Sequence, residues 1–79
     1  MVGKVTFINT QTRNFCIATG KGKCTICNAS NINDIKVGDS IEFDNILGGS
    51  YFYNLRTERI SASVVYWDIN IGSSIEYCK

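Results

Sequence analysis

Proline and histidine are both absent from this chain, and neither sign of charge dominates it. Without proline, the turns depend on Gly and Asn. Without histidine, the chain lacks the side chain that most often serves as a general base or a metal ligand. Eight basic and seven acidic residues give a net charge of +1, so no strong field draws the protein to DNA, RNA or an anionic membrane.

Long hydrophobic runs are missing as well. The N-terminus has no apolar signal core after Lys4, and no later run approaches the length that spans a membrane. We therefore expect a cytoplasmic protein that makes no membrane contact. In that compartment Cys16, Cys24, Cys27 and Cys78 are expected to be reduced thiols rather than disulfides.

The 79 residues provide enough chain for a single core, so residues 1–79 are expected to form one domain. Short β-prone segments with alternating apolar side chains dominate it, and no long helical pattern is present. Glycines mark a hairpin turn at 20–23, one helical turn is predicted within 31–36, and 72–79 is predicted to be a frayed end. The expected strands are 2–8, 15–19, 24–27, 40–44, 51–60 and 64–71. Short strands at this spacing indicate an all-β barrel or sandwich, and closing a barrel removes exposed strand edges.

Three segments resemble motifs of the cold-shock domain family. Residues 3–9 are similar to its opening Gly-x-Val-Lys-Trp-Phe-Asn, with Phe7 in place of the tryptophan. Residues 13–17 stand where the family has Gly-Phe-Gly-Phe-Ile. Residues 37–43 are similar to the Gly-x-x-Val-x-Phe signature of its fourth strand.

A fourth segment, Gly49 followed by Asn54-Leu55, resembles the closing Gly…Ala-x-Asn-Val of the same family. The resemblance covers residues 3–57 in the family's order and spacing. It implies a small five-stranded barrel of the OB-fold type. Residues 58–79 are then a C-terminal extension that adds a further strand.

The resemblance also implies a function, since aromatic side chains on the family's second and third strands stack on unpaired bases. Here Asn14 and Cys16 occupy two of those positions, and Thr25, Cys27 and Asn28 occupy three more. We therefore expect weak, sequence-tolerant binding of single-stranded RNA or DNA. The residues expected to stack are Phe7, Phe15, Tyr51 and Tyr53, and those expected to neutralise phosphates are Lys4, Arg13, Lys23 and Arg56.

Two features of this face have alternative interpretations. Arg13, Lys21 and Lys23 are expected to cluster around the second and third strands, either as a binding face or as an ordinary solvated surface. Strict alternation places Phe7 in the core with Val5, whereas the resemblance turns it outward.

The alternative function is a protein-interaction module on the same barrel, in which the C-terminal extension supplies the contact. Side-chain exposure distinguishes the two functions. Exposure of Phe7, Tyr51 and Tyr53 beside the basic residues would favour nucleic acid. Burial of these rings, or their coverage by the last strand, would favour a protein partner.

Patterns for catalysis and metal binding are weak. Cys24-x-x-Cys27 has the spacing of zinc ligands, but a strand points the two sulfurs to opposite faces. The four cysteines are therefore expected to be small buried apolar side chains, and a zinc protein is a third hypothesis that metal analysis would exclude. No phosphate loop followed by a helix and no carboxylate pair in a cleft is evident. We expect no enzyme activity, no cofactor, no metal and no small-molecule substrate.

Overall fold

A computed structural model describes residues 2–46 and 49–78, without the side chains of 45, 46 and 49–51. The strands are β1 (Val2–Asn9), β2 (Asn14–Gly20), β3 (Lys23–Ala29), β4 (Ser40–Ile46), β5 (Gly49–Asn54), β6 (Glu58–Arg59) and β7 (Ala62–Asn70). The helices are η1 (Ile32–Asp34), η2 (Ile71–Ser73) and α1 (Ser74–Tyr77), where η marks a 3₁₀ helix. Within the described ranges, no helix has the length and apolar character needed to cross a membrane.

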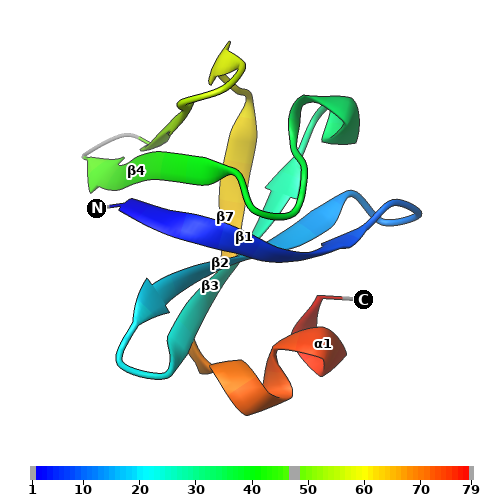
Figure 1. The fold of residues 1–79 in the computed structure, drawn as a ribbon, viewed down its shortest axis with the longest axis vertical. Coiled ribbons are helices and arrows are strands. Elements are labelled where there is room, and N and C mark those ends of the chain that lie inside the picture. Colours follow the sequence, from blue (N-terminus) through cyan, green and yellow to red (C-terminus); the bar gives the residue numbers. More distant parts are fainter. Residues whose placement is uncertain (1, 47–48, 79) are drawn as a thin grey trace.

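The strands form one antiparallel sheet in the order β6-β5-β4-β1-β2-β3-β7, which curls into a half-barrel (Figure 1). The all-β, barrel-like architecture predicted from the sequence is confirmed. The prediction of a five-stranded barrel is wrong, because the described residues contribute seven strands to the sheet. A turn at 55–57, followed by Glu58 with a φ of 76°, divides the expected strand 51–60 into β5 and β6.

The inner core lies inside the curl of the sheet. Side chains alternate across each strand, so one face of β1, β2, β4 and β5 supplies most of this core. Phe43 stacks on Phe52 with ring centroids 5.8 Å apart and on Trp67 of β7 with centroids 6.1 Å apart. These rings connect the two ends of the curled sheet. The buried residues of the inner core are Val5, Phe15, Ile17, Cys27, Ala29, Ile35, Ile41, Phe43, Phe52 and Ile60.

A second, smaller apolar cluster lies on the outer face of β2 and β3. Cys16, Cys24, Ile26 and Cys78 are all fully buried there. Cys78 follows α1, which contacts β3 and lies below β2 and β3 in Figure 1. The prediction of a frayed end at 72–79 is therefore wrong for the described residues up to 78, because this segment forms η2 and α1 and packs on the sheet.

Candidate functional site

The aromatic residues expected to stack on bases have different environments. Phe15 is fully buried in the inner core, which corrects its expected role, because a buried ring has no face to offer a ligand. Phe7 is half-buried and packs against the outer cluster of Cys16. Tyr53 is half-buried on β5. The side chain of Tyr51 lies outside the described part of the structure.

Phe7 and Tyr53 are also far apart on the sheet. Val2 of β1 pairs with Glu42 of β4, which pairs with Tyr53 of β5, so Tyr53 is level with the start of β1. Phe7 lies roughly 16 Å further along β1 and two strands across the sheet, at ~3.3 Å per residue and ~4.8 Å per strand. These two rings do not form one stacking platform.

The expected basic cluster is divided between two ends of the sheet. Arg13 lies in the turn between β1 and β2, whereas Lys21 and Lys23 lie at the turn between β2 and β3. The seven residues of β2 separate the two turns by roughly 20 Å. Lys4 pairs with Ala18 and so lies nearer to the second turn. The exposed residues Lys4, Lys21 and Lys23 therefore share one end, and the exposed Arg13 lies at the other.

Arg56 is engaged by a carboxylate of its own chain. Its Nε donates to Oδ1 of Asp39 and its Nη2 donates to Oδ2, both at 2.9 Å. The side-chain amide of Asn54 and the backbone N–H of Lys36 donate to the same carboxylate, at 2.9 and 2.8 Å. The hydrogen bonds from Arg56 are the main reason why the pKa of Asp39 falls to about 2. Arg56 therefore holds the loop before β4 against the end of β5, and its expected role as a phosphate ligand stays a prediction.

The outer face of β2 and β3 is apolar. Cys16 pairs with Ile26 across these strands, and both side chains are fully buried. Cys27 belongs to the inner core, and Thr25, two residues before it, shares its side of the strand. The outward positions of β3 are Cys24, Ile26 and Asn28, so two of the positions aligned with family aromatics in fact point inward.

The segment formed by η2 and α1 covers this outer face. The Cys16 thiol donates to the carbonyl oxygen of Ser74 at 3.8 Å, and Cys78 is buried in the same cluster. The backbone N–H of Ile71 donates to the carbonyl oxygen of Gly22 at 2.9 Å, which fixes the start of the segment beside the β2–β3 turn. The outer face of β2 and β3 is thus covered by a later segment of the same chain.

Three thiols meet beneath this cover. Cys16, Cys24 and Cys78 lie together with Ile26 in one buried apolar cluster. Burial raises the pKa of Cys16 and Cys24 to about 11 and also raises that of Cys78, so all three are thiols at neutral pH. Cys27 lies in the inner core, so Cys24 and Cys27 point to opposite faces, as alternation predicts. Among the described residues, no three or more His, Cys, Asp or Glu side chains are placed to hold a metal ion.

Large apolar side chains are exposed at the end of the chain. The rings of Tyr66 and Tyr77 meet edge to face with centroids 5.1 Å apart, and 44% and 43% of these residues stay exposed. Ile71 and Ile75 are 42% and 60% exposed. We call these four residues, which lie on β7, η2 and α1, the tail surface.

Exposed charges of both signs lie on the elements that carry the tail surface or pair with them. Asp68 and Glu76 are exposed on β7 and α1. Lys23, also exposed, pairs with Asn70 at the end of β7. The tail surface is thus an apolar, partly aromatic area with a mixed charged margin.

The sequence interpretation missed the residues of η2 and α1. One signal for them was present, because Ser73-x-x-Glu76 has the spacing of a helix capping box. A second was the spacing of Ser74 and Cys78, which places both on one side of a helical turn. Both residues are buried in the structure.

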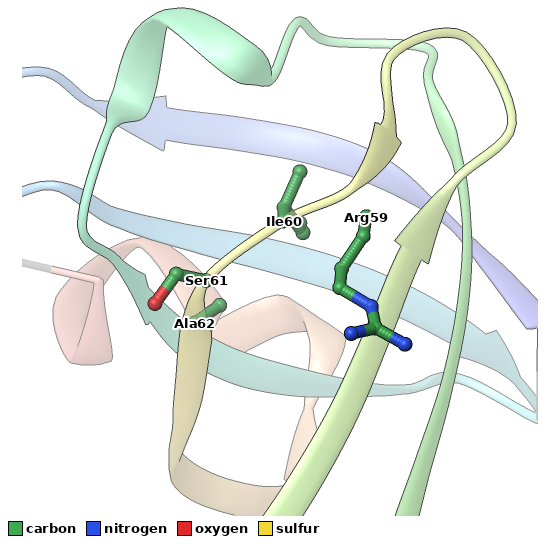
Figure 2. Close-up of a pocket in the computed structure, with 4 residues that line it drawn as sticks. All are labelled: Arg59, Ile60, Ser61 and Ala62. Carbon is green, nitrogen blue, oxygen red and sulfur yellow. The ribbon is translucent and has the colours of Figure 1, made fainter.

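An open hollow lies where β6 leads into β7 (Figure 2). Its lining includes Arg59, Ile60, Ser61 and Ala62, which follow one another along the chain. In Figure 2 the side chains of Arg59 and Ser61 point to different sides of the chain. These four residues do not bring a set of polar groups together on one point, as a site for catalysis requires.

Comparison with protein-family models, curated proteins and solved structures finds no match for this chain. The resemblance to cold-shock domains therefore rests on the sequence motifs alone.

Proposed function

We propose that the chain is a protein-interaction module that contacts its partner through the tail surface. The observation that carries the proposal is the exposed pair of Tyr66 and Tyr77, together with two exposed isoleucines in the same C-terminal segment as Tyr77. Tyrosine offers a large rigid ring with a polar end and is enriched in protein interfaces. An apolar area of this kind at the surface of a small domain is typical of an interaction site.

The partner that fits this surface is a protein with an apolar patch surrounded by side chains of both signs. Lys and Arg of such a partner would approach Asp68 and Glu76, while its carboxylates would approach Lys23. Mixed charge at the margin of an apolar centre is the usual arrangement of a protein interface. A polyanion is repelled by Asp68 and Glu76, which makes nucleic acid a poorer fit for the tail surface.

The finer description of the fold also belongs to this proposal. We propose that the barrel is of the OB type, because β1, β2 and β3 form a meander and β1 also pairs with β4. The last long strand, β7, pairs with β3 and would complete a path of five strands, β4-β1-β2-β3-β7. The hairpin partner β5 and the short β6 are then additions at the β4 edge.

A photo-cross-linking experiment tests the proposed interaction. A photoreactive amino acid is placed at Ile75, the most exposed residue of the tail surface, in the full chain produced in cells. Cross-linked species are then separated and identified by mass spectrometry. We expect defined cross-linked protein bands from this position.

Val37 supplies the matched control, because it is 63% exposed but lies in the loop before β4. The same photoreactive residue at Val37 should give few or none of the bands seen at Ile75. Equal patterns from both positions, or cross-links from Ile75 to nucleic acid alone, would contradict the proposal. The Tyr77→Ser substitution should weaken the Ile75 bands, because it removes one of the two paired rings.

A second candidate function, weak binding of single-stranded nucleic acid, is favoured by the exposed Lys4, Lys21 and Lys23 at one end of the sheet. Three phosphate contacts would give a salt slope of only about −2 for a single strand. An amide chemical-shift titration with a short oligopyrimidine at low salt tests this candidate. Shifts that saturate around 21–23 would support it, and an unchanged spectrum would exclude it.

A further inference from the structure

The cluster of three thiols beneath α1 brings together cysteines that are far apart in the sequence. Cys16 lies on β2, Cys24 on β3 and Cys78 immediately after α1. All three are fully buried and belong to the same apolar cluster on the outer face of the sheet. We propose that Cys16 and Cys78 are an oxidation site, at which a disulfide ties the C-terminal segment to β2. This goes beyond the proposed protein interaction and does not depend on it.

The geometry of the sheet selects Cys78, rather than Cys24, as the partner of Cys16. Cys16 is directly opposite Ile26, and Cys24 is directly opposite Ala18. Cys16 and Cys24 are therefore diagonal neighbours, whose Cα atoms are usually ~7–8 Å apart across strands. A disulfide requires a Cα separation of about 4.4–6.8 Å, so this pair would have to distort the sheet.

Cys78 is not constrained by a strand ladder. It ends a helix of four residues, and its backbone N–H is held by the carbonyl oxygen of Ser74 at 3.0 Å. A helix of four residues that packs outside the sheet can shift so that Cys78 reaches Cys16. Such a shift leaves the pairing of β2 with β3 intact.

The oxidation site opens without unfolding of the inner core. The segment of η2 and α1 lies on the outer face, whereas Phe43, Phe52 and the rest of the inner core lie on the other side of the sheet. Local opening of a terminal segment requires less free energy than global unfolding. Because burial keeps the thiols protonated, reaction with an oxidant waits for this opening, which exposes both sulfurs.

The oxidant is a low-molecular-weight disulfide, RSSR. The thiolate of Cys78, formed by loss of its proton to solvent, attacks one sulfur of RSSR, which forms a mixed disulfide and releases RS⁻. The thiolate of Cys16 then attacks the Cys78 sulfur, which forms the Cys16–Cys78 bond and releases the second RS⁻. Both leaving thiolates take up the two protons, so two protein thiols are oxidised and one RSSR is reduced to two RSH.

Oxidised glutathione serves as the probe. The reduced full chain is incubated with it, free thiols are blocked, and the protein is digested with trypsin without reduction. Mass spectrometry then identifies the linked peptides. The three thiols of the cluster fall in separate tryptic peptides, 14–21, 24–36 and 60–79.

The expected product is a link between the peptide of Cys16 and the peptide of Cys78. Linkage should also raise Tm by about 10–30 °C, because it closes a long loop of the unfolded chain. Cys24→Ser is the matched control and should form the same link at a rate within about threefold of the original chain. Cys16→Ser should lose it.

Three results would overturn the proposal. They are a dominant link to the peptide of Cys24, glutathionylation without an internal link, and the absence of any reaction while the folded protein remains intact. Identification of the linked peptides in the unsubstituted protein tests the proposal even where a cysteine variant does not fold. Reversal by a dithiol reductant, with return of the original Tm, completes the expected behaviour.

Discussion

Replacement of Asp39 by Asn tests the group of hydrogen bonds that joins Asp39 to Arg56, Asn54 and Lys36. The carboxylate accepts hydrogen bonds from Arg56, Asn54 and the backbone of Lys36. Only 9% of the Asp39 side chain is exposed, whereas 43% of that of Arg56 is exposed. Asn has the same shape but offers one acceptor oxygen and no charge, so D39N loses the ion pair and part of the hydrogen bonding.

The size of the effect follows from the pKa of Asp39, which falls from 3.8 to about 2 in the folded protein. A shift of one unit corresponds to ~1.36 kcal/mol, so an upper limit is about 2.4 kcal/mol. Solvent screening at the exposed guanidinium of Arg56 reduces this to about 1–2 kcal/mol. Because the pKa is lower in the folded state, the stabilisation is complete above pH ~4 and is lost as the pH falls to about 2.

Urea denaturation of both proteins between pH 7 and pH 2 measures this contribution. D39N should unfold with about 1–2 kcal/mol less free energy at pH 7, and the difference should shrink toward zero at pH 2. Glu42→Gln, which removes an exposed carboxylate on β4, should change stability by less than about 0.5 kcal/mol. A D39N deficit that stays constant from pH 7 to pH 2 would refute the electrostatic origin of the effect.

Two further substitutions test the packing of the sheet. A Cβ at Gly3 would overlap the carbonyl oxygen of Ala18 and Cγ2 of Ile17, so Gly3→Ala should lower the free energy of unfolding by about 3 kcal/mol in urea denaturation. Gly72→Ala is the control, because its Cβ would make an ordinary van der Waals contact, and it should change the free energy of unfolding by less than about 1 kcal/mol. A small effect of Gly3→Ala would mean that β1 and β2 are less closely apposed than described. Thr25 is fully buried, and its hydroxyl has no hydrogen-bond partner among the described residues. Thr25→Val should therefore leave the free energy of unfolding, measured by thermal denaturation, unchanged or raise it by up to about 1 kcal/mol. A loss of more than about 1 kcal/mol would indicate that the hydroxyl has a hydrogen-bond partner.

Local patterns were sufficient to predict most strands. The alternation of Ile41 and Phe43 predicted the buried face of β4, and both residues are fully buried. The glycines of the 20–23 turn predicted a hairpin, and Gly20 and Gly22 take φ values of 95° and 71°. These predictions succeeded because period-two alternation and positive φ depend on neighbouring residues alone.

The candidate site could not be predicted in the same way, because it depends on contacts between distant segments. Arg13 and Lys21 are close in sequence, yet a whole strand separates them. Arg56 is hydrogen-bonded to Asp39 of another segment, and no local sequence pattern around Arg56 indicates that pair. Phe15 faces the inner core through the register of β2 against β1, which the family motif did not fix.

The apolar outer face and the C-terminal cover depend on each other. Exposed aromatic rings provide flat surfaces on which bases can stack. Cys16, Cys24 and Ile26 provide no such surface. Left exposed, such side chains would forgo ~25 cal/mol for each Å² of apolar surface that burial would remove from water. Covering them with α1 recovers that free energy and removes the face as a place for bases to bind. The same short segment leaves Tyr77 and Ile75 exposed, so the apolar side chains available to the proposed partner lie on the tail and not on the outer face of β2 and β3.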